Sequence, residues 1–260
     1  MRVLLCENLI RILEKKAPAE YAMEWDHVGL LVGRRTKEIH KVLLTVDVTI
    51  EVIEMAINEH ADMIVSHHPM IFGRVDRIND ETVLGRKILD LVEHGIACYA
   101  MHTNFDTIGG MARETARMLE LKNTEVLEET KDGEGIGQVG YLKQPMTNAS
   151  LAEYIKQKFG LKNVIMYGKP DRIIEKIAIC PGSGRSVIDV AAEKKAECLI
   201  TGDIGHHEGL DAGELGVDII DASHYGLEQI FMHIMYDYIK GYDPDLEIEI
   251  ANMGVPFSIV

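Results

Sequence analysis

The sequence predicts an α/β protein built from two related halves, each a mostly parallel or mixed sheet with flanking helices. The first observation is that short runs rich in valine, isoleucine and leucine alternate with amphipathic runs, as strands and helices do in a covered sheet. The second is that this alternation occurs twice along the 260 residues. The third is that histidines and acidic residues follow several predicted strands, where ligands collect in such folds.

The first half begins with a helix at about residues 7–16, which has apolar side chains on one face and is stopped by Pro18. Strands and helices then alternate. Strands are expected at 41–46, 61–66 and 96–100, with helices at about 51–59 and 81–93 between them.

The second half repeats this order after a turn-rich break at 131–135. Its expected elements are strands at 137–142, 164–167, 176–180, 196–201 and 217–221, with helices at about 151–159 and 187–194. We expect one domain to contain 1–125 plus 222–260, including a C-terminal helix, and the other to contain 126–221.

A constant offset between the strands indicates an internal duplication. The strand that starts at Lys176 follows the one at Lys41 by 135 residues (176 − 41 = 135). The strand at Ala196 follows the one at Ala61 by the same number (196 − 61 = 135). Strand–helix–strand order alone could produce one coincident offset, but a second match is harder to explain without a repeat.

Two histidine–acid pairs extend this relationship. His224 follows His102 by 122 residues (224 − 102 = 122), and Glu228 follows Asp106 by the same number (228 − 106 = 122). The two offsets differ by 13 (135 − 122 = 13), which predicts that the first copy has a longer loop after His68.

Composition and charge exclude several classes of function. The formal net charge is −15, from 42 acidic and 27 basic residues, so the surface repels nucleic acid phosphates and direct nucleic acid binding is not expected. The amino terminus becomes charged too early for a signal peptide, and no run reaches about 18 apolar residues. The four cysteines are scattered and form no CxxC. We expect a cytoplasmic protein that does not enter a membrane.

The histidines and acids at the strand ends predict a metal site. Histidine and carboxylate ligands without a thiolate suit iron, manganese or zinc, and a pair of such cations can activate water for a displacement. A His-x-x-x-acid spacing places both groups on one face if a helix begins there. We expect two divalent ions and five ligands, namely His67, His68, Asp106, His224 and Glu228.

Several neighbouring residues have more than one interpretation. His102 either acts in catalysis, as a proton shuttle, or orients Asp106 from behind. His206 and His207 either line the pocket or cap a helix near Gly205.

Three further features are interpreted as structural. Asp47 is expected to cap the following helix, although it could also face the pocket. The glycine-rich run 181–184 is expected to be a tight turn rather than a phosphate-binding loop, because it lacks the residues of a P-loop. The single tryptophan, Trp25, and the few other aromatic residues give no obvious stacking platform.

The motifs occur in an order that resembles a known family. They are Trp25-Asp26-x-Val28-Gly29-Leu30, Ser66-His67-His68-Pro69, His102-Thr103-Asn104-Phe105-Asp106, Thr201-Gly202-Asp203 with His206-His207, and His224-x-x-x-Glu228. From Pro18 to Phe257 the chain resembles the GTP cyclohydrolase 1 type 2 homologues, also called the Nif-three-like family.

The resemblance implies a duplicated α/β fold with a dinuclear metal centre in the cleft between the halves, and assembly into a ring-shaped homohexamer, a trimer of dimers. The five expected ligands match the family's ligands, with Glu228 as the bridge, and His102 matches a nearby site residue. His27 departs from the family, whose members usually carry asparagine there.

Two functions follow from these observations. The first is a metal-dependent hydrolase that acts on a small anionic, nucleotide-like substrate. The more specific version of this hypothesis is hydrolytic ring opening of the guanine base of GTP. The alternative is a non-catalytic metal-binding or interaction scaffold whose ring-shaped assembly matters more than turnover.

Overall fold

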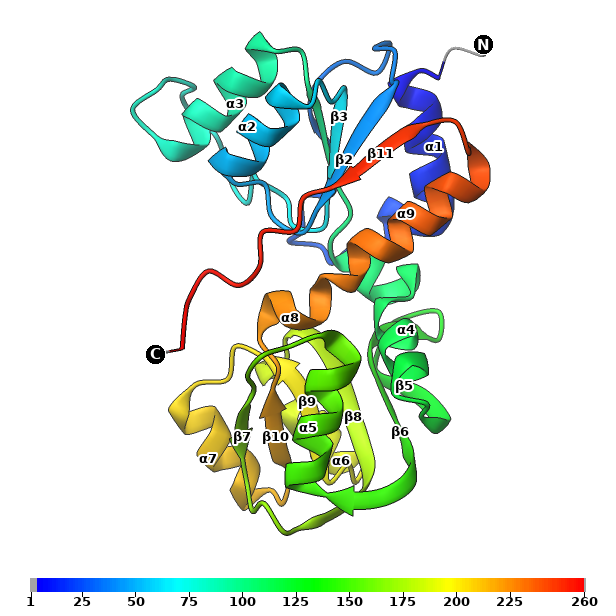
Figure 1. Cartoon of the computed structure of the whole chain (residues 1–260), viewed down its shortest axis with the longest axis vertical. Helices are drawn as coiled ribbons and strands as arrows, with labels where there is room; N and C mark the ends of the chain where they lie inside the picture. Colours follow the sequence, from blue (N-terminus) through cyan, green and yellow to red (C-terminus); the bar gives the residue numbers. More distant parts are fainter. Residues whose placement is uncertain (1–3, 260) are drawn as a thin grey trace. The chain divides into compact units, whose positions relative to one another are not determined.

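The computed structural model describes residues 4–259, which fold as two compact units. The first unit contains the chain up to Gly109 together with Gln229–Met253, and the second contains Gly110–Glu228 with the segment from Gly254 onward. Each unit has its own sheet and its own helices (Figure 1). This confirms the predicted fold class of two α/β halves.

The first unit is a mixed sheet covered by helices. Its elements are α1 (Cys6–Lys16), η1 (Ala19–Tyr21), β1 (Gly29–Val32), β2 (Lys41–Thr45), α2 (Ile50–Asn58), β3 (Met63–Ser66), α3 (Val83–Glu93), β4 (Ala97–Ala100), η2 (Phe105–Gly109), α9 (Ile230–Tyr242) and β11 (Glu247–Ile250). The strand order is β1-β4-β3-β2-β11, and only β1 runs antiparallel to its neighbour. In Figure 1, α2 and α3 cover one face of this sheet and α1 and α9 the other.

The second unit repeats this plan around another mixed sheet. Its elements are α4 (Met111–Met118), β5 (Lys122–Lys131), β6 (Glu134–Thr147), α5 (Asn148–Phe159), β7 (Ile165–Tyr167), β8 (Ile173–Ser183), η3 (Arg185–Val187), α6 (Ile188–Glu193), β9 (Cys198–Gly202), α7 (His206–Glu214), β10 (Asp218–Asp221) and α8 (His224–Glu228). The strand order is β5-β6-β8-β9-β10-β7, in which β8, β9 and β10 are parallel.

The two sheets share their central arrangement. The parallel trio β2-β3-β4 of the first unit corresponds to β8-β9-β10 of the second, and an antiparallel strand flanks β4 and β10 in each case. The connection from β3 to α3 has 16 residues (67–82), whereas that from β9 to α7 has three (203–205). The difference, 16 − 3 = 13, is the longer loop that the two offsets predict.

Burial on both faces of the central strands explains why these segments form a core. The strands β3 and β4 are buried along their whole length, and their side chains are mainly apolar, as is expected of strands covered on both sides. Helix α2 adds Val52 and Ile53 to the same cluster that contains Leu43 and Ile64, and Thr49 caps its first turn by accepting a hydrogen bond from the Val52 amide.

The boundaries of the two units differ from those of the expected domains. The chain passes from one unit to the other after Gly109 and after Glu228, whereas we expected boundaries after residues 125 and 221. Helix α4 packs on β6 and β8, and β5 pairs with β6, so the segment from Gly110 belongs to the second unit rather than ending the first at residue 125. Helix α8 packs on β8 and β9, which keeps His224–Glu228 in the second unit as well. Of the helices within residues 4–259, none combines the length and apolar character that crossing a membrane requires.

Candidate metal-binding residues

Three histidines of the first unit lie together at the carboxyl ends of two neighbouring strands. His67 and His68 follow β3, and His102 follows β4. Each offers a ring nitrogen, and these three atoms all lie within 4.8 Å of one another. The cluster arises because β3 and β4 are parallel and adjacent, so the loops that leave them begin at the same edge of the sheet.

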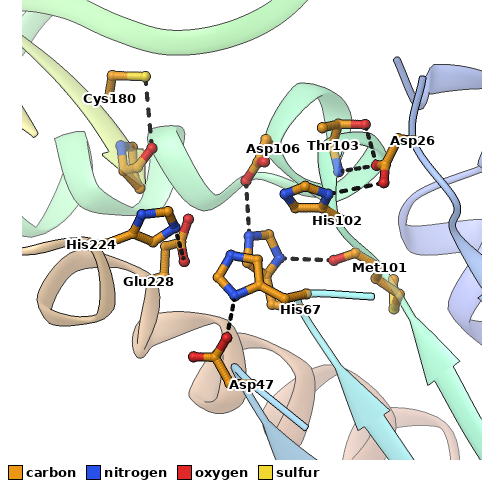
Figure 2. A network of polar contacts seen from close by, with 12 residues as sticks. Asp26, Asp47, His67, Met101, His102, Thr103, Asp106, Cys180, His224 and Glu228 are labelled. Carbon is orange, nitrogen blue, oxygen red and sulfur yellow. Dashed lines mark hydrogen bonds and ion pairs between the residues drawn. The ribbon is translucent and has the colours of Figure 1, made fainter. Parts of the chain in front are cut away.

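His67 is the most deeply placed member of this cluster. Its side chain is fully buried, and its Nδ1 lies 2.8 Å from the carbonyl oxygen of Met101 (Figure 2). Because a carbonyl can only accept, Nδ1 carries the proton and Nε2 keeps the lone pair in the neutral ring. That Nε2 lies 3.5 Å from Oδ1 of Asp106, so the imidazole and the expected carboxylate ligand face each other.

His68 and His102 are held in the same way by carboxylates. Nδ1 of His68 lies 2.8 Å from Oδ1 of Asp47, and Nδ1 of His102 lies 3.0 Å from Oδ1 of Asp26. Each carboxylate accepts, which again leaves Nε2 with the lone pair. The expectation that Asp47 caps α2 is therefore wrong. Thr49 is the cap, and Asp47 orients a histidine instead.

Asp26 is tied to the end of β4 by more than one bond. Its fully buried side chain also accepts hydrogen bonds from the Thr103 amide, at 3.0 Å, and from the Thr103 hydroxyl, at 2.5 Å. Burial alone opposes ionisation, but the hydrogen bonds from His102 and Thr103 outweigh it, and the pKa of Asp26 lies well below its usual range. The negative charge beside His102 is therefore permanent at neutral pH.

Asp106 occupies a helical turn of unusual geometry. It lies in η2, one turn of π-helix, and its amide donates to the carbonyl of His102 at 3.0 Å. This bond has the i→i−4 spacing of an α-helix, so the predicted helical relationship of His102 and Asp106 is present, and the π-turn begins at Phe105. Such turns occur often at functional sites because they redirect one side chain within a helix.

The second unit provides a smaller cluster around His224 and Glu228. Both residues belong to the short helix α8, and Nε2 of His224 lies 3.1 Å from Oε2 of Glu228 (Figure 2). Nδ1 of the same ring lies 2.7 Å from Oδ2 of Asp203. The Glu228 carboxylate is only 3% exposed, and burying a charge at such a position is costly unless a cation or several hydrogen bonds compensate it.

Two glycines let the backbone approach this cluster closely. Gly182 has φ +79°, and a Cβ placed on it would lie 2.5 Å from Oε1 of Glu228. A Cβ on Gly202 would lie 2.4 Å from the amide nitrogen of His224. The expectation of a simple tight turn at 181–184 missed this role, since strand β8 continues to Ser183 and Gly182 makes room for the carboxylate.

The four imidazoles share one arrangement. In each, Nδ1 lies within hydrogen-bond distance of an oxygen atom, and Nε2 is the nitrogen that could bind a metal. The four pairs are His67 with Met101, His68 with Asp47, His102 with Asp26, and His224 with Asp203. Outer-shell oxygens of this kind orient metal-binding histidines and raise their basicity. The residues present therefore fit a divalent metal ion, and this pattern could not be predicted from the spacing of the histidines alone.

His206, His207 and His27 belong to neither of these clusters. His206 and His207 are exposed and form the first turn of α7, whose N-cap is Gly205 without a side-chain cap bond, so the helix starts where the second interpretation placed it but neither histidine caps it. Their rings contact each other at a centroid distance of 5.2 Å. His27 is exposed, and its Nδ1 lies 3.2 Å from the carbonyl oxygen of Trp25.

Comparison with known proteins agrees with the motif order. The family model Duf34/NIF3 (NGG1p interacting factor 3) matches residues 4–255. The chain belongs to this family. It is 35% identical over 258 residues to a "GTP cyclohydrolase 1 type 2 homolog" of Clostridium perfringens, covering 97% of this chain and 98% of that protein.

Two further relatives extend the comparison. A Helicobacter pylori protein named "GTP cyclohydrolase 1 type 2" is 30% identical to this chain over 261 residues. The match covers 98% of this chain and 99% of that protein. The crystal structure of a Bacillus cereus protein related to NIF3 has a TM-score of 0.93 at 24% identity, with full coverage of both chains. That protein thus shares the fold of this chain over its whole length.

Proposed function

We propose that this Duf34/NIF3 protein binds two divalent metal ions and uses them to hydrolyse a small anionic, nucleotide-like substrate. The proposed ligands are His67, His68 and Asp106 of the first unit and His224 and Glu228 of the second. The observation that carries the proposal is the shared arrangement of the imidazoles, in which an oxygen holds each Nδ1 so that Nε2 can bind a metal.

The proposed ligand set suits a limited group of metals. Imidazole nitrogen and carboxylate oxygen without thiolate favour iron, manganese or zinc over copper(I), and the histidines disfavour calcium. Two dications with Asp106 and Glu228 leave a local formal charge of about +2. This positive charge, within a chain of net charge −15, favours a phosphate-bearing or carboxylate-bearing substrate.

His102 has the surroundings of a proton carrier. Its Nδ1 donates to the ionised Asp26, so Nε2 can accept a proton and the carboxylate then stabilises the imidazolium. When bound, the metal ions supply Lewis acidity and a water molecule of lowered pKa. The names of the relatives make GTP the first substrate to test, by hydrolytic opening of the guanine imidazole ring with C8 leaving as formate.

Metal content tests the binding part of this proposal. We expect elemental analysis to find two metal ions per wild-type chain and substantially less in His68→Ala and Glu228→Ala. His94→Ala is the matched control, because His94 is exposed at the end of α3 and its Nδ1 lies 2.9 Å from the carbonyl oxygen of Asp90 in the same helix. Wild-type stoichiometry in both ligand variants would remove those assignments.

Turnover tests the catalytic part. Protein loaded with iron, manganese or zinc is incubated with GTP, other nucleotides and phosphoesters, and the release of formate or phosphate is measured. We expect release with at least one metal and its loss in His102→Ala. Absence of turnover with all three metals would favour the non-catalytic scaffold instead.

Assembly and location are separate expectations. We propose a cytoplasmic homohexamer, a trimer of dimers, on the basis of the family resemblance. Sedimentation equilibrium measures the mass directly, and a monomer of 29.1 kDa would contradict the proposal. With a net charge of −15 per chain, the contacts between subunits must be local and apolar enough to outweigh the repulsion.

A further inference from the structure

Two exposed aromatic side chains stand beside the histidine cluster of the first unit. Trp25 is 62% exposed and Phe72 is 61% exposed. Their ring centroids lie 5.8 Å and 6.2 Å from that of His102, with interplanar angles of 72° and 90°. Neither ring stacks face to face on the imidazole.

The exposure of Trp25 does not result from a loose segment. The next residue, Asp26, is bonded to His102 and Thr103, and the Met23 amide donates to the Thr103 hydroxyl at 2.8 Å. The backbone on both sides of Trp25 is therefore fixed to the end of β4. The side chain nevertheless remains mostly exposed, although burying a side chain of this size would contribute strongly to stability.

Phe72 is presented by the loop that distinguishes the two units. It lies in the 16-residue connection 67–82, which has only the three residues 203–205 as its counterpart. The preceding residues Met70 and Ile71 pack against the core of the first unit. The chain thus anchors this loop with two apolar side chains and leaves the third, an aromatic ring, in solvent.

We propose that Trp25 and Phe72 form a subsite that stacks on a planar heteroaromatic ring, namely the base of a mononucleotide, beside His102. Single exposed apolar residues are common on protein surfaces, but here the centroids of two aromatic rings lie within 6.2 Å of that of one imidazole, His102. Aromatic side chains bind nucleobases by stacking, whatever the base. No pattern in the sequence indicated such a stacking site, because Trp25 and Phe72 lie far apart in the chain and are brought near His102 by folding.

The charge of the chain limits the ligand to one nucleotide rather than a polymer. A protein that tracks a nucleic acid backbone needs a basic groove, and this chain has a net charge of −15. The inference rests on the proposed function, because the subsite would hold the base of the nucleotide-like substrate beside the proposed metal ligands. The inference adds that Trp25 and Phe72 select a substrate that carries a base.

Trp25 is the only tryptophan of the chain, so its fluorescence reports this subsite alone. Metal-loaded protein is titrated with GTP and, in parallel, with tripolyphosphate, which has the same charged chain without the base. We expect GTP to quench the emission of Trp25 in a saturable way and tripolyphosphate to leave it almost unchanged. Equal quenching by both compounds would overturn the inference.

Variants of Phe72 separate stacking from simple packing. We expect Phe72→Ala to raise the Kd for GTP about 5-fold to 100-fold, the range that loss of one stacking ring produces, and Phe72→Tyr to restore it. The Kd for tripolyphosphate, measured by calorimetry, should stay the same. Val92→Ala is the control, since Val92 is also 61% exposed but lies on α3. An unchanged Kd for GTP in Phe72→Ala would overturn the proposal.

Two further measurements distinguish this inference from the proposed function. If wild-type protein shows no turnover but binds GTP in a way that depends on Phe72, the hydrolase proposal fails and the subsite stands. If turnover is present and Phe72→Ala leaves both Kd and KM for GTP unchanged, the subsite alone fails. A change in molecular mass of Phe72→Ala in sedimentation would instead assign the ring to a subunit contact and overturn the subsite.

Discussion

Asp62 and Glu197 make the same pair of hydrogen bonds in the two units. Oδ2 of Asp62 accepts hydrogen bonds from the amides of His40 and Lys41, at 2.8 Å and 3.2 Å, where β2 and β3 begin. Oε2 of Glu197 accepts from the amides of Glu175 and Lys176, at 2.6 Å and 3.0 Å. All three positions are related by the offset of 135 residues (197 − 62, 175 − 40 and 176 − 41). The duplication thus preserves a specific contact as well as the order of elements.

This relationship predicts how stability depends on pH. Burial of the Asp62 carboxyl opposes its ionisation, but the two backbone donors and the Lys37 ammonium, 3.1 Å away, outweigh it and hold its pKa below the usual 3.8. A carboxyl with a lowered pKa stabilises the fold above its unfolded pKa, and this stabilisation is lost as the pH falls through the folded value.

Asp62→Asn should therefore reduce the free energy of unfolding at pH 7 by about 1–2 kcal/mol, the cost of losing hydrogen bonds to a charged acceptor. The difference from wild type should shrink as the pH falls below 3.8, which urea unfolding at several pH values measures. Asp237→Asn, on the exposed face of α9, is the control. A difference that is constant with pH would contradict this account.

Asp203 should control the metal affinity of His224 without being a ligand itself. It fixes Nδ1 of the ring, and losing such an outer oxygen typically lowers metal affinity about 10-fold to 100-fold. We expect Asp203→Ala to lose metal to a competing chelator at a chelator concentration about 10-fold to 100-fold lower than the wild type requires. Asp211→Ala, an exposed acid on α7, removes the same charge and should behave as wild type.

Gly182→Ala should impair metal binding through a steric effect on Glu228. The added Cβ meets Oε1 at 2.5 Å, and the backbone at φ +79° is strained for alanine by about 1–2 kcal/mol. Gly133→Ala is a close control, because φ is +77° there and no atom lies within 4 Å of the new Cβ. Thermal unfolding should show a similar backbone cost in both, while elemental analysis should show metal loss only in Gly182→Ala. Equal metal content in the two variants would count against the steric effect.

Removal of metal should reveal the cost of the buried Glu228 carboxylate. A ligand that binds only the folded state stabilises it, by about 2.7 kcal/mol at 100 times its Kd, so metal should raise the Tm of the wild type. Glu228→Gln keeps the shape without the charge and should show little of this rise. Without metal it should be no less stable than the wild type, because an amide costs less to bury than a carboxylate. Glu214→Gln, exposed on α7, should retain the full metal-dependent rise.

The sequence determined the periodic features of this protein. Apolar runs, helix faces and the two offsets predict the α/β class, the duplication and the 13-residue difference between the loops, because burial imposes local patterns that repeat along the chain. The helix predicted at 7–16 forms as Cys6–Lys16, and the strands predicted at 41–46 and 96–100 form as Lys41–Thr45 and Ala97–Ala100. Motif order alone also indicated the family.

The residues that orient the histidines could be identified from the folded chain alone. Asp26 reaches His102 across 76 positions, and Asp47 and Asp203 each reach their rings across 21, distances over which no local pattern links two side chains. For the same reason the placement of Trp25 and Phe72 beside His102 could not be predicted from their separate positions in the chain. Local sequence specifies strands and turns, whereas side-chain partners depend on which strand ends the folded sheet places side by side.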